Sequence, residues 1–273
     1  MRRVGIGYRC PLARWIESRP PEIECLEIVA EHFFNGGVDR LKQLAGSYPL
    51  FVHSLGISLG TPGPLDTAAL ESLASVVEIA RPEWVSEHVA FTNSGEVDLG
   101  HLNPVAPTRE MLSIIADHAS EVRERCGKPL LLENITTHLL LPGEMSEPEF
   151  LNRLCEEAEC RLLLDVTNLF INARNHRFEP RSWLRELEPK FIAQLHVVGY
   201  SIRGGRWEDL HAEPIQRELQ ELIVDVLRYA DPEAIVLERD DNFPVARELA
   251  TELLMLKAVG NEHAPDKSAR AAS

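Results

Sequence analysis

Short apolar runs recur at nearly regular intervals along this 273-residue chain, and their spacing constrains its fold more than any other feature. Most of them are continuous segments of Val, Ile and Leu, as expected for strands that are buried on both faces of a parallel sheet. The runs span residues 4–8, 25–29, 50–53, 84–88, 130–133, 162–165, 192–196 and 234–238. Their length and composition predict a series of β-strands.

Longer segments with helical periodicity separate these runs. Residues 65–80, preceded by Pro62 and Pro64, carry apolar side chains three or four positions apart, which is typical of an amphipathic helix. The same pattern recurs in residues 111–122, 148–158, 215–227 and 245–256. A repeated alternation of strand and helix over most of the chain predicts an α/β protein with a single (β/α)8 TIM barrel.

An open, doubly wound sheet is the main alternative to the barrel. Such a sheet normally carries a glycine-rich phosphate-binding turn after an early strand. Gly5 and Gly7 instead lie inside the first predicted strand. We therefore predict one barrel domain over residues 1–258, followed by a polar, disordered tail over residues 259–273.

The composition excludes several classes of function. The chain has 43 acidic and 28 basic residues, a formal charge of −15, so nucleic acid is not an expected partner. No apolar stretch approaches the ~20 residues that span a bilayer. The first predicted strand begins near residue 4, so we expect no signal peptide. We expect a cytoplasmic protein with no membrane partner, in which the five cysteines are reduced thiols.

Polar residues end six consecutive predicted strands. These strand ends carry His53, Glu87-His88, Glu133-Asn134, Asp165, His196 and Glu238. In a barrel, the carboxyl ends of all strands meet at one mouth, where active sites are built. A lone histidine is more often a core or surface residue than a metal ligand. Six strand ends in succession with potential metal ligands indicate a metal site.

Two nearby pairs extend this set: Asn168 follows Asp165 by about one helical turn, and Asp209 alternates with His211. Asn168 alone could also cap a turn. The predicted metal ligands are therefore His53, His88, Glu133, Asp165, Asn168, His196, Asp209, His211 and Glu238. Nine ligands suit two or three ions with Glu133 as a bridge, and their mixture of imidazole and carboxylate favours Fe, Zn or Mn.

Other polar residues receive weaker interpretations. Glu87 is expected to face the opposite side of its strand from His88 and to form an ion pair there. The remaining histidines are interpreted as surface residues or as supports of the ligands, with His32 and His101 as the main candidates for a role at the mouth.

At these residues the sequence resembles the multinuclear non-haem iron-dependent enzymes over residues 3–258. That family includes the catalytic subunit of methanobactin oxazolone synthase and the peptidyl-cysteine enzyme of thiaglutamate biosynthesis. The matching stretches are Gly5-Ile6-Gly7-Tyr8-Arg9, Leu26-Glu27-Ile28 with Glu31 following, His53-Ser54-Leu55-Gly56-Ile57-Ser58-Leu59-Gly60, Val85-Ser86-Glu87-His88, Leu132-Glu133-Asn134, Leu163-Leu164-Asp165-Val166-Thr167-Asn168, His196-Val197-Val198-Gly199, Asp209-Leu210-His211 and Leu237-Glu238-Arg239-Asp240. The combination is specific, although no single stretch is.

The resemblance implies a barrel of the xylose isomerase and endonuclease IV type that holds two or three iron ions. It assigns His53, His88 and Glu133 to one metal, and Glu133, Asp165, His196 and Glu238 to a second. It assigns Asn168, Asp209 and His211 to a third. The chain departs from the family pattern at Ser54, where glycine is usual, and at Tyr200, where a second histidine is common.

The resemblance also implies a reaction. We expect O2-dependent oxidation of a cysteine in a ribosomally synthesised precursor peptide, with Glu133, Asp165 and His211 as catalytic residues. Tyr200, Asn134 and Asp240 are expected in the substrate pocket, and a small leader-peptide-binding protein is the expected heterodimer partner.

Two alternatives remain open. One is a zinc- or manganese-dependent hydrolase or isomerase acting on a sugar or phosphodiester. The other is a barrel without catalytic activity that binds peptides, which the full set of predicted ligands argues against.

Overall fold

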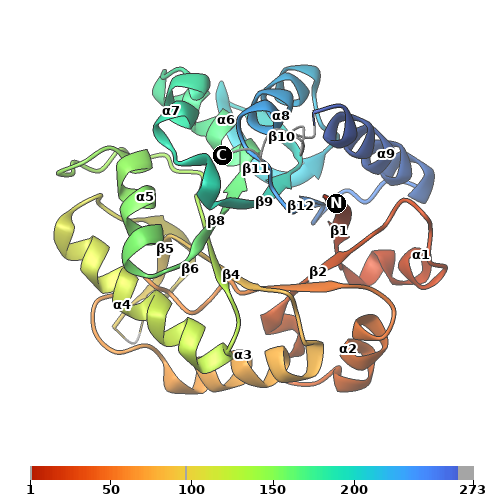
Figure 1. The fold of residues 1–273 in the computed structure, drawn as a ribbon, viewed down its shortest axis with the longest axis horizontal. Helices are drawn as coiled ribbons and strands as arrows, with labels where there is room; N and C mark the ends of the chain where they lie inside the picture. Colours follow the sequence, from red (N-terminus) through yellow and green to blue (C-terminus); the bar gives the residue numbers. More distant parts are fainter. Residues whose placement is uncertain (1, 96, 264–273) are drawn as a thin grey trace, which may run out of the picture.

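A closed ring of parallel strands forms the centre of the molecule in the computed structural model, which describes residues 2–95 and 97–263 (Figure 1). The order around the ring is β1-β12-β9-β8-β7-β4-β3-β2. These strands are β1 (Arg3–Gly7), β2 (Leu26–Val29), β3 (Leu50–His53), β4 (Val85–His88), β7 (Leu130–Glu133), β8 (Arg161–Asp165), β9 (Ile192–Val197) and β12 (Ala234–Leu237). The predicted barrel is confirmed, and each predicted strand lies within a residue or two of its observed position.

Helices surround the strand ring, as Figure 1 shows. They are α1 (Ala13–Glu17), α2 (Val38–Ala45), α3 (Thr67–Ala80), α4 (Arg109–Cys126), α5 (Glu147–Glu157), α6 (Val166–His176), α7 (Pro180–Glu186), α8 (Arg217–Tyr229) and α9 (Ala246–Glu262). Short 3-10 turns lie at Cys10–Leu12, Ala30–Phe33 and Pro189–Phe191. Side-chain caps begin several of the helices: Asp66 caps α3, Thr108 caps α4 and Ser146 caps α5.

The last helix bears on the predicted domain boundary. Helix α9 continues past residue 258 to Glu262, so the first residues assigned to the tail are helical. Residues 264–273 of the predicted tail lie outside the described residues.

Side chains alternate between two cores along each barrel strand. On β3, Leu50 and Val52 belong to the large core between strands and helices, whereas Phe51 belongs to a small core inside the ring. The small core comprises Cys25, Phe51, Trp84, Leu131, Leu163, Ala193, Ala234 and Val236. Because successive strand residues face opposite sides, a residue two positions beyond such an inward residue also faces the barrel axis. This alternation positions the site described below.

Two antiparallel hairpins extend the barrel, and neither is predicted from the sequence. One pairs β5 (Ala90–Ser94) with β6 (Val97–Pro104), and the other pairs β10 (Gly199–Arg203) with β11 (Arg206–Glu213). They follow the carboxyl ends of β4 and β9, and therefore lie at the mouth end of the barrel. Gly204 and Gly205 have φ angles of 56° and 79° in the second turn, a conformation that glycine adopts without strain.

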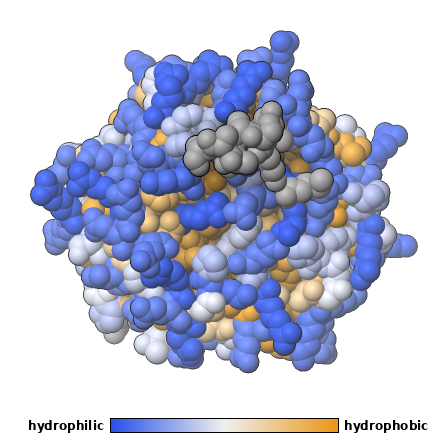
Figure 2. Space-filling model, viewed as in Figure 1, coloured by the Kyte–Doolittle hydropathy of each residue, from blue (hydrophilic) through white to orange (hydrophobic). Residues whose placement is uncertain are grey.

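The outer surface is mostly hydrophilic on the face shown in Figure 2, with smaller apolar areas between the polar side chains. Within the described ranges, none of the helices combines the length and the hydropathy needed to cross a bilayer.

Candidate metal centre

The inward residues at the mouth end of the strands are polar. His53, His88, Glu133 and Asp165 end β3, β4, β7 and β8, and each lies two or four positions beyond a residue of the small inner core. His196 is the penultimate residue of β9, and Glu238 directly follows β12. All six side chains are buried. Their potential ligand atoms gather into overlapping groups, each with its atoms within 4.8 Å of one another.

The first group consists of His53, His88 and Glu133. The Nε2 atoms of both histidines lie 3.4 Å from Glu133 Oε2, and this oxygen has no hydrogen-bond partner among the described residues. The opposite ring nitrogens are held by other residues: His53 Nδ1 lies 2.8 Å from Ser86 Oγ, and His88 Nδ1 lies 3.2 Å from Glu87 Oε1. Such contacts orient the ring of a histidine that binds metal.

Glu87 therefore supports His88 directly. Besides its contact with Nδ1, its carboxylate accepts hydrogen bonds from the backbone N–H groups of His88 and Ile57. It thus joins β4 to the loop that follows β3. Its partner is the neighbouring histidine and the backbone, rather than a cation on the far side of the strand as the sequence suggested.

The second group consists of Glu133, Asp165, His196 and Glu238. His196 Nδ1 lies 3.0 Å from Glu133 Oε1 and 3.0 Å from Glu238 Oε2. Asp165 Oδ1 caps α6 by accepting a hydrogen bond from Asn168 N, whereas the buried Oδ2 has no partner among the described residues. Because buried carboxylate oxygens normally have partners, unpaired ones that converge on an imidazole fit a cation.

The third group consists of His211, Glu238 and Asp240, which differs from the expected trio. His211 Nδ1 lies 3.0 Å from Asp240 Oδ2, and His211 Nε2 lies 2.8 Å from Asp209 Oδ2. Asp209 Oδ1 is buried and has no hydrogen-bond partner among the described residues, so this side chain also has a free oxygen beside His211.

The side chain of Asn168 forms hydrogen bonds with other residues in this structure. Its Nδ2 donates to Asn134 O, and its Oδ1 accepts a hydrogen bond from the Thr136 hydroxyl. Its role as a ligand stays a prediction, as do the roles of the other predicted ligands.

Charge crowding shifts the pKa values of these groups. Burial, with the nearby charges of Asp209 and Glu133, raises the pKa of Asp165 well above its usual value. Burial alone would lower the pKa of His196, but the carboxylates of Glu27, Glu238 and Glu133 outweigh it and raise that pKa well above the ordinary range. Burial lowers the pKa of His53 well below its usual value. A bound cation would neutralise the carboxylates that cause this crowding.

A hollow of about 870 Å³ opens at this mouth. Its lining includes His88, His211 and Glu238, together with residues of the β5–β6 hairpin such as His101. Apart from its histidines, the ionisable side chains among its described lining residues are all acidic: Glu31, Asp66, Asp98, Glu238 and Asp240.

The three predicted substrate-pocket residues are placed differently. Asp240 lines the mouth hollow. Asn134 instead joins β7 to β8, because its side chain bonds both Asp165 N and Asp165 O. Tyr200 stacks on Phe170 at 5.1 Å and donates its hydroxyl to Glu218, outside the described lining of this hollow.

Glu27 and Arg9 lie in stretches that match the family, but no role was predicted for either from the sequence. Glu27 Oε1 lies 2.6 Å from His196 Nε2, although Glu27 sits within the β2 run and not at its end. One terminal nitrogen of Arg9 lies 2.6 Å from Asp240 Oδ1 and 3.5 Å from Glu238 Oε1. The period-two alternation could have found Glu27, because it follows the inward-facing Cys25 by two residues.

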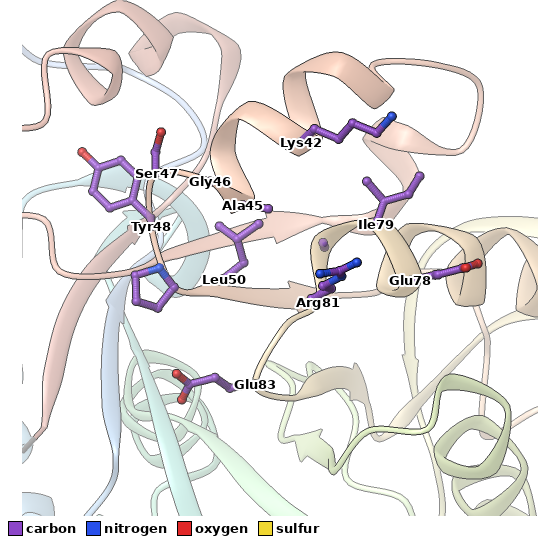
Figure 3. A pocket seen from close by; sticks show the side chains of 12 residues that line it. Lys42, Ala45, Gly46, Ser47, Tyr48, Leu50, Glu78, Ile79, Arg81 and Glu83 are labelled. Carbon is purple, nitrogen blue, oxygen red and sulfur yellow. The ribbon is translucent and has the colours of Figure 1, made fainter.

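A second hollow, of about 950 Å³, lies at the opposite end of the barrel (Figure 3). It is lined by residues of α2 and α3 and by the connections around Tyr48 and Arg81, near the start of β3. Its charged residues, such as Lys42 and Glu78, come from solvent-facing positions, and none of the metal-ligand groups lies in its described lining. The mouth is therefore the candidate site.

Comparison with known proteins places the whole chain in a family. The family model described as "RiPP precursor modification enzyme MbnB/TglH/ChrH" matches residues 3–261. A UPF0276 protein of Chromobacterium violaceum is 34% identical over 258 residues, covering 93% of this chain and 94% of that protein. A UPF0276 protein of Acaryochloris marina is 30% identical over 265 residues, covering 96% of both.

Solved structures share the fold at low sequence identity. L-ribulose 3-epimerase has a TM-score of 0.64 at 15% identity, covering 100% of this chain and 99% of that one. Endonuclease IV from Thermus thermophilus has a TM-score of 0.61 at 18% identity, covering 95% of this chain and 99% of that one. The expected xylose isomerase and endonuclease IV type of barrel is thereby confirmed.

Proposed function

Because the chain belongs to the RiPP precursor modification enzyme family MbnB/TglH/ChrH, we propose that it oxidises a cysteine of a ribosomally synthesised precursor peptide, using O2 and two or three iron ions. The observation that carries this proposal is the set of overlapping ligand groups at the barrel mouth, in which Glu133 and Glu238 each belong to two groups. A shared carboxylate suits adjacent ions, which it can bridge.

The donor set is compatible with iron. The three groups contain only imidazole and carboxylate, which suit iron, zinc and manganese. The chain's own cysteines lie elsewhere, and Cys25, the one in the inner core, has a pKa raised by burial, which keeps it as a thiol. Bound iron would supply the redox chemistry and would accept the thiolate of the peptide cysteine as a soft ligand.

The chain's own residues would hold and orient these partners. Ser86 and Glu87 fix the rings of His53 and His88 toward Glu133. We propose Glu133, Asp165 and His211 as the catalytic residues, because these side chains, one from each end and one from the middle of the series of ligand groups, would hold the metal ions against the substrate. His211 and Asp240 line the mouth hollow, where a peptide would enter.

The charge of the mouth favours a peptide over a phosphorylated substrate. Its described lining has acidic groups and no lysine or arginine to bind a phosphate. A small partner protein that presents the leader peptide completes the proposal. The proposed location in the cytoplasm agrees with a reduced peptide thiol as substrate.

The test is a reconstituted reaction. The protein is loaded with Fe(II) without oxygen, mixed with candidate precursor peptides encoded beside its gene and with any co-encoded leader-binding protein, and then exposed to O2. We expect a mass change on a cysteine-containing peptide. The matched controls are the same peptide with Cys→Ser and the enzyme variant Glu133→Gln.

A different outcome would identify a different enzyme class. If no peptide changes mass, and the zinc- or manganese-loaded protein instead hydrolyses a phosphodiester or isomerises a sugar, the proposal is wrong and the chain acts as a metal-dependent hydrolase or isomerase.

A further inference from the structure

A chain of buried polar groups crosses the barrel interior beneath the metal centre. Trp84 Nε1 donates to Gln194 Oε1 at 2.6 Å, and Gln194 Nε2 donates to Glu27 Oε2 at 2.5 Å. Glu27 Oε1 then lies 2.6 Å from His196 Nε2. The four side chains come from β2, β9 and the residue before β4, and each is at most 5% exposed. These side chains are therefore shielded from bulk solvent.

Trp84 determines the direction of every hydrogen bond in this row of side chains. An indole N–H can only donate, so the Gln194 oxygen must face Trp84 and the Gln194 NH2 group must face Glu27. A carboxylate only accepts, so Glu27 accepts from Gln194 with one oxygen and from His196 with the other. His196 Nε2 must therefore carry a hydrogen.

This direction determines which His196 nitrogen is available to a metal. With the hydrogen on Nε2, the neutral imidazole has its lone pair on Nδ1. Nδ1 is the atom that lies 3.0 Å from both Glu133 Oε1 and Glu238 Oε2. His53 and His88 have the reverse arrangement, because Ser86 and Glu87 hold their Nδ1 atoms and their Nε2 atoms face Glu133.

We propose that Glu27, Gln194 and Trp84 are positioning residues that fix His196 in the Nε2–H tautomer, so that it binds metal through Nδ1. The inference rests on the metal centre of the proposed function but not on its iron, oxygen or peptide. Zinc(II), which is diamagnetic, is therefore the probe, and the experiment remains informative even if the proposed reaction is wrong.

The first measurement is the nitrogen spectrum of His196. Protein labelled with 15N-histidine is stripped of metal, loaded with zinc(II), and examined by long-range 1H–15N correlation, with His196→Ala identifying the signal. We expect a zinc-bound Nδ1 and a protonated Nε2 at His196. Coordination through Nε2 would overturn the proposal.

The second measurement uses Glu27→Gln. Gln194 still presents its NH2 group, so the new amide must accept with its oxygen and turn its own NH2 group toward His196. Nε2 then becomes the acceptor, and the hydrogen moves to Nδ1, the nitrogen that should bind metal. We expect zinc at the second group to bind about 10–100-fold more weakly, as is typical when a residue supporting a ligand is lost.

The double variant Glu27→Gln with Trp84→Phe separates this mechanism from a loss of charge or of packing. Without the indole, Gln194 can rotate its amide and accept from the new NH2 group, which lets the oxygen at position 27 face His196 Nε2–H again. We expect the double variant to regain zinc affinity and the Nδ1-bound spectrum relative to Glu27→Gln. A merely structural role predicts the reverse, because the second substitution adds a cavity.

Glu83→Gln is the matched control for the loss of one negative charge, since Glu83 lies at the other end of the barrel in a half-exposed pair with Arg3. We expect it to bind zinc as the wild type does. Wild-type zinc affinity in Glu27→Gln, or a double variant weaker than Glu27→Gln, would overturn the proposal.

Discussion

Glu133→Gln is expected to reduce the stability that bound metal gives the protein. The loss should be larger than for a substitution of any ligand that belongs to only one of the three groups. Glu133 is 2% exposed and belongs to both the first and the second group, one through Oε2 and the other through Oε1. The amide has the same shape as the carboxylate but carries no charge. The substitution therefore weakens two sites without creating a cavity.

The magnitude follows from mass action. An ion at 100 times its dissociation constant stabilises the folded state by about 2.7 kcal/mol, so two ions contribute about 5.4 kcal/mol. At about 2 °C per kcal/mol for a chain of this size, the wild type should gain roughly 10 °C in melting temperature. If the variant binds each ion about 100-fold more weakly, the same metal concentration gives only about 0.8 kcal/mol, or roughly 2 °C.

The assay is thermal unfolding with and without Fe(II) under anaerobic conditions, with zinc(II) as a second metal and metal content measured in parallel. Glu221→Gln is the control, because Glu221 is an exposed partner of Arg217 and belongs to none of the ligand groups. A Glu133→Gln variant that keeps two ions and the full wild-type shift would show that Glu133 does not bind metal at both groups.

Three further substitutions have distinct expected outcomes. Asp165→Asn should stabilise the metal-free protein at neutral pH, because the raised pKa of Asp165 means that its ionisation opposes folding. This gain should fade as pH falls toward the unfolded-state pKa of aspartate. Equal urea denaturation midpoints for the metal-free variant and the metal-free wild type at neutral pH would contradict it. Ser86→Ala removes the 2.8 Å contact to His53 Nδ1 and should weaken metal binding about 10–100-fold by isothermal titration; unchanged affinity would refute this role. Phe51→Ala removes a fully buried ring stacked on Trp84 at 4.1 Å and should lower the free energy of unfolding by about 3–5 kcal/mol in urea; a loss under about 1 kcal/mol would contradict this.

The sequence predicts the barrel well because both of its signals are local. Strands buried on two faces read as short apolar runs, and the inward or outward direction of each side chain follows from the period of two. His53 faces inward because Phe51 does, and Glu133 faces inward because Leu131 does. Such residues can be placed at a common mouth from the pattern of the chain alone.

The remaining features depend on relations between strands, which the local pattern does not contain. The period of two predicts that Glu27 faces inward, but its contact with His196 depends on the stagger of the ring, which brings the two residues level. The hairpins have partly exposed strands with weak apolar patterning, so their sequences resemble loops. The pairing of His211 with Asp240 joins the second hairpin to the segment after β12, and Tyr200 turns toward Glu218 in α8.

Anomalous diffraction at the iron absorption edge, from crystals of the anaerobically Fe(II)-loaded protein, would locate bound iron at the barrel mouth. Two or three iron peaks are expected at the barrel mouth. One should lie among His53, His88 and Glu133, and another among Glu133, Asp165, His196 and Glu238. A crystal soaked to saturation with Fe(II) but with no transition-metal peak at these residues would show that the mouth is not a metal centre.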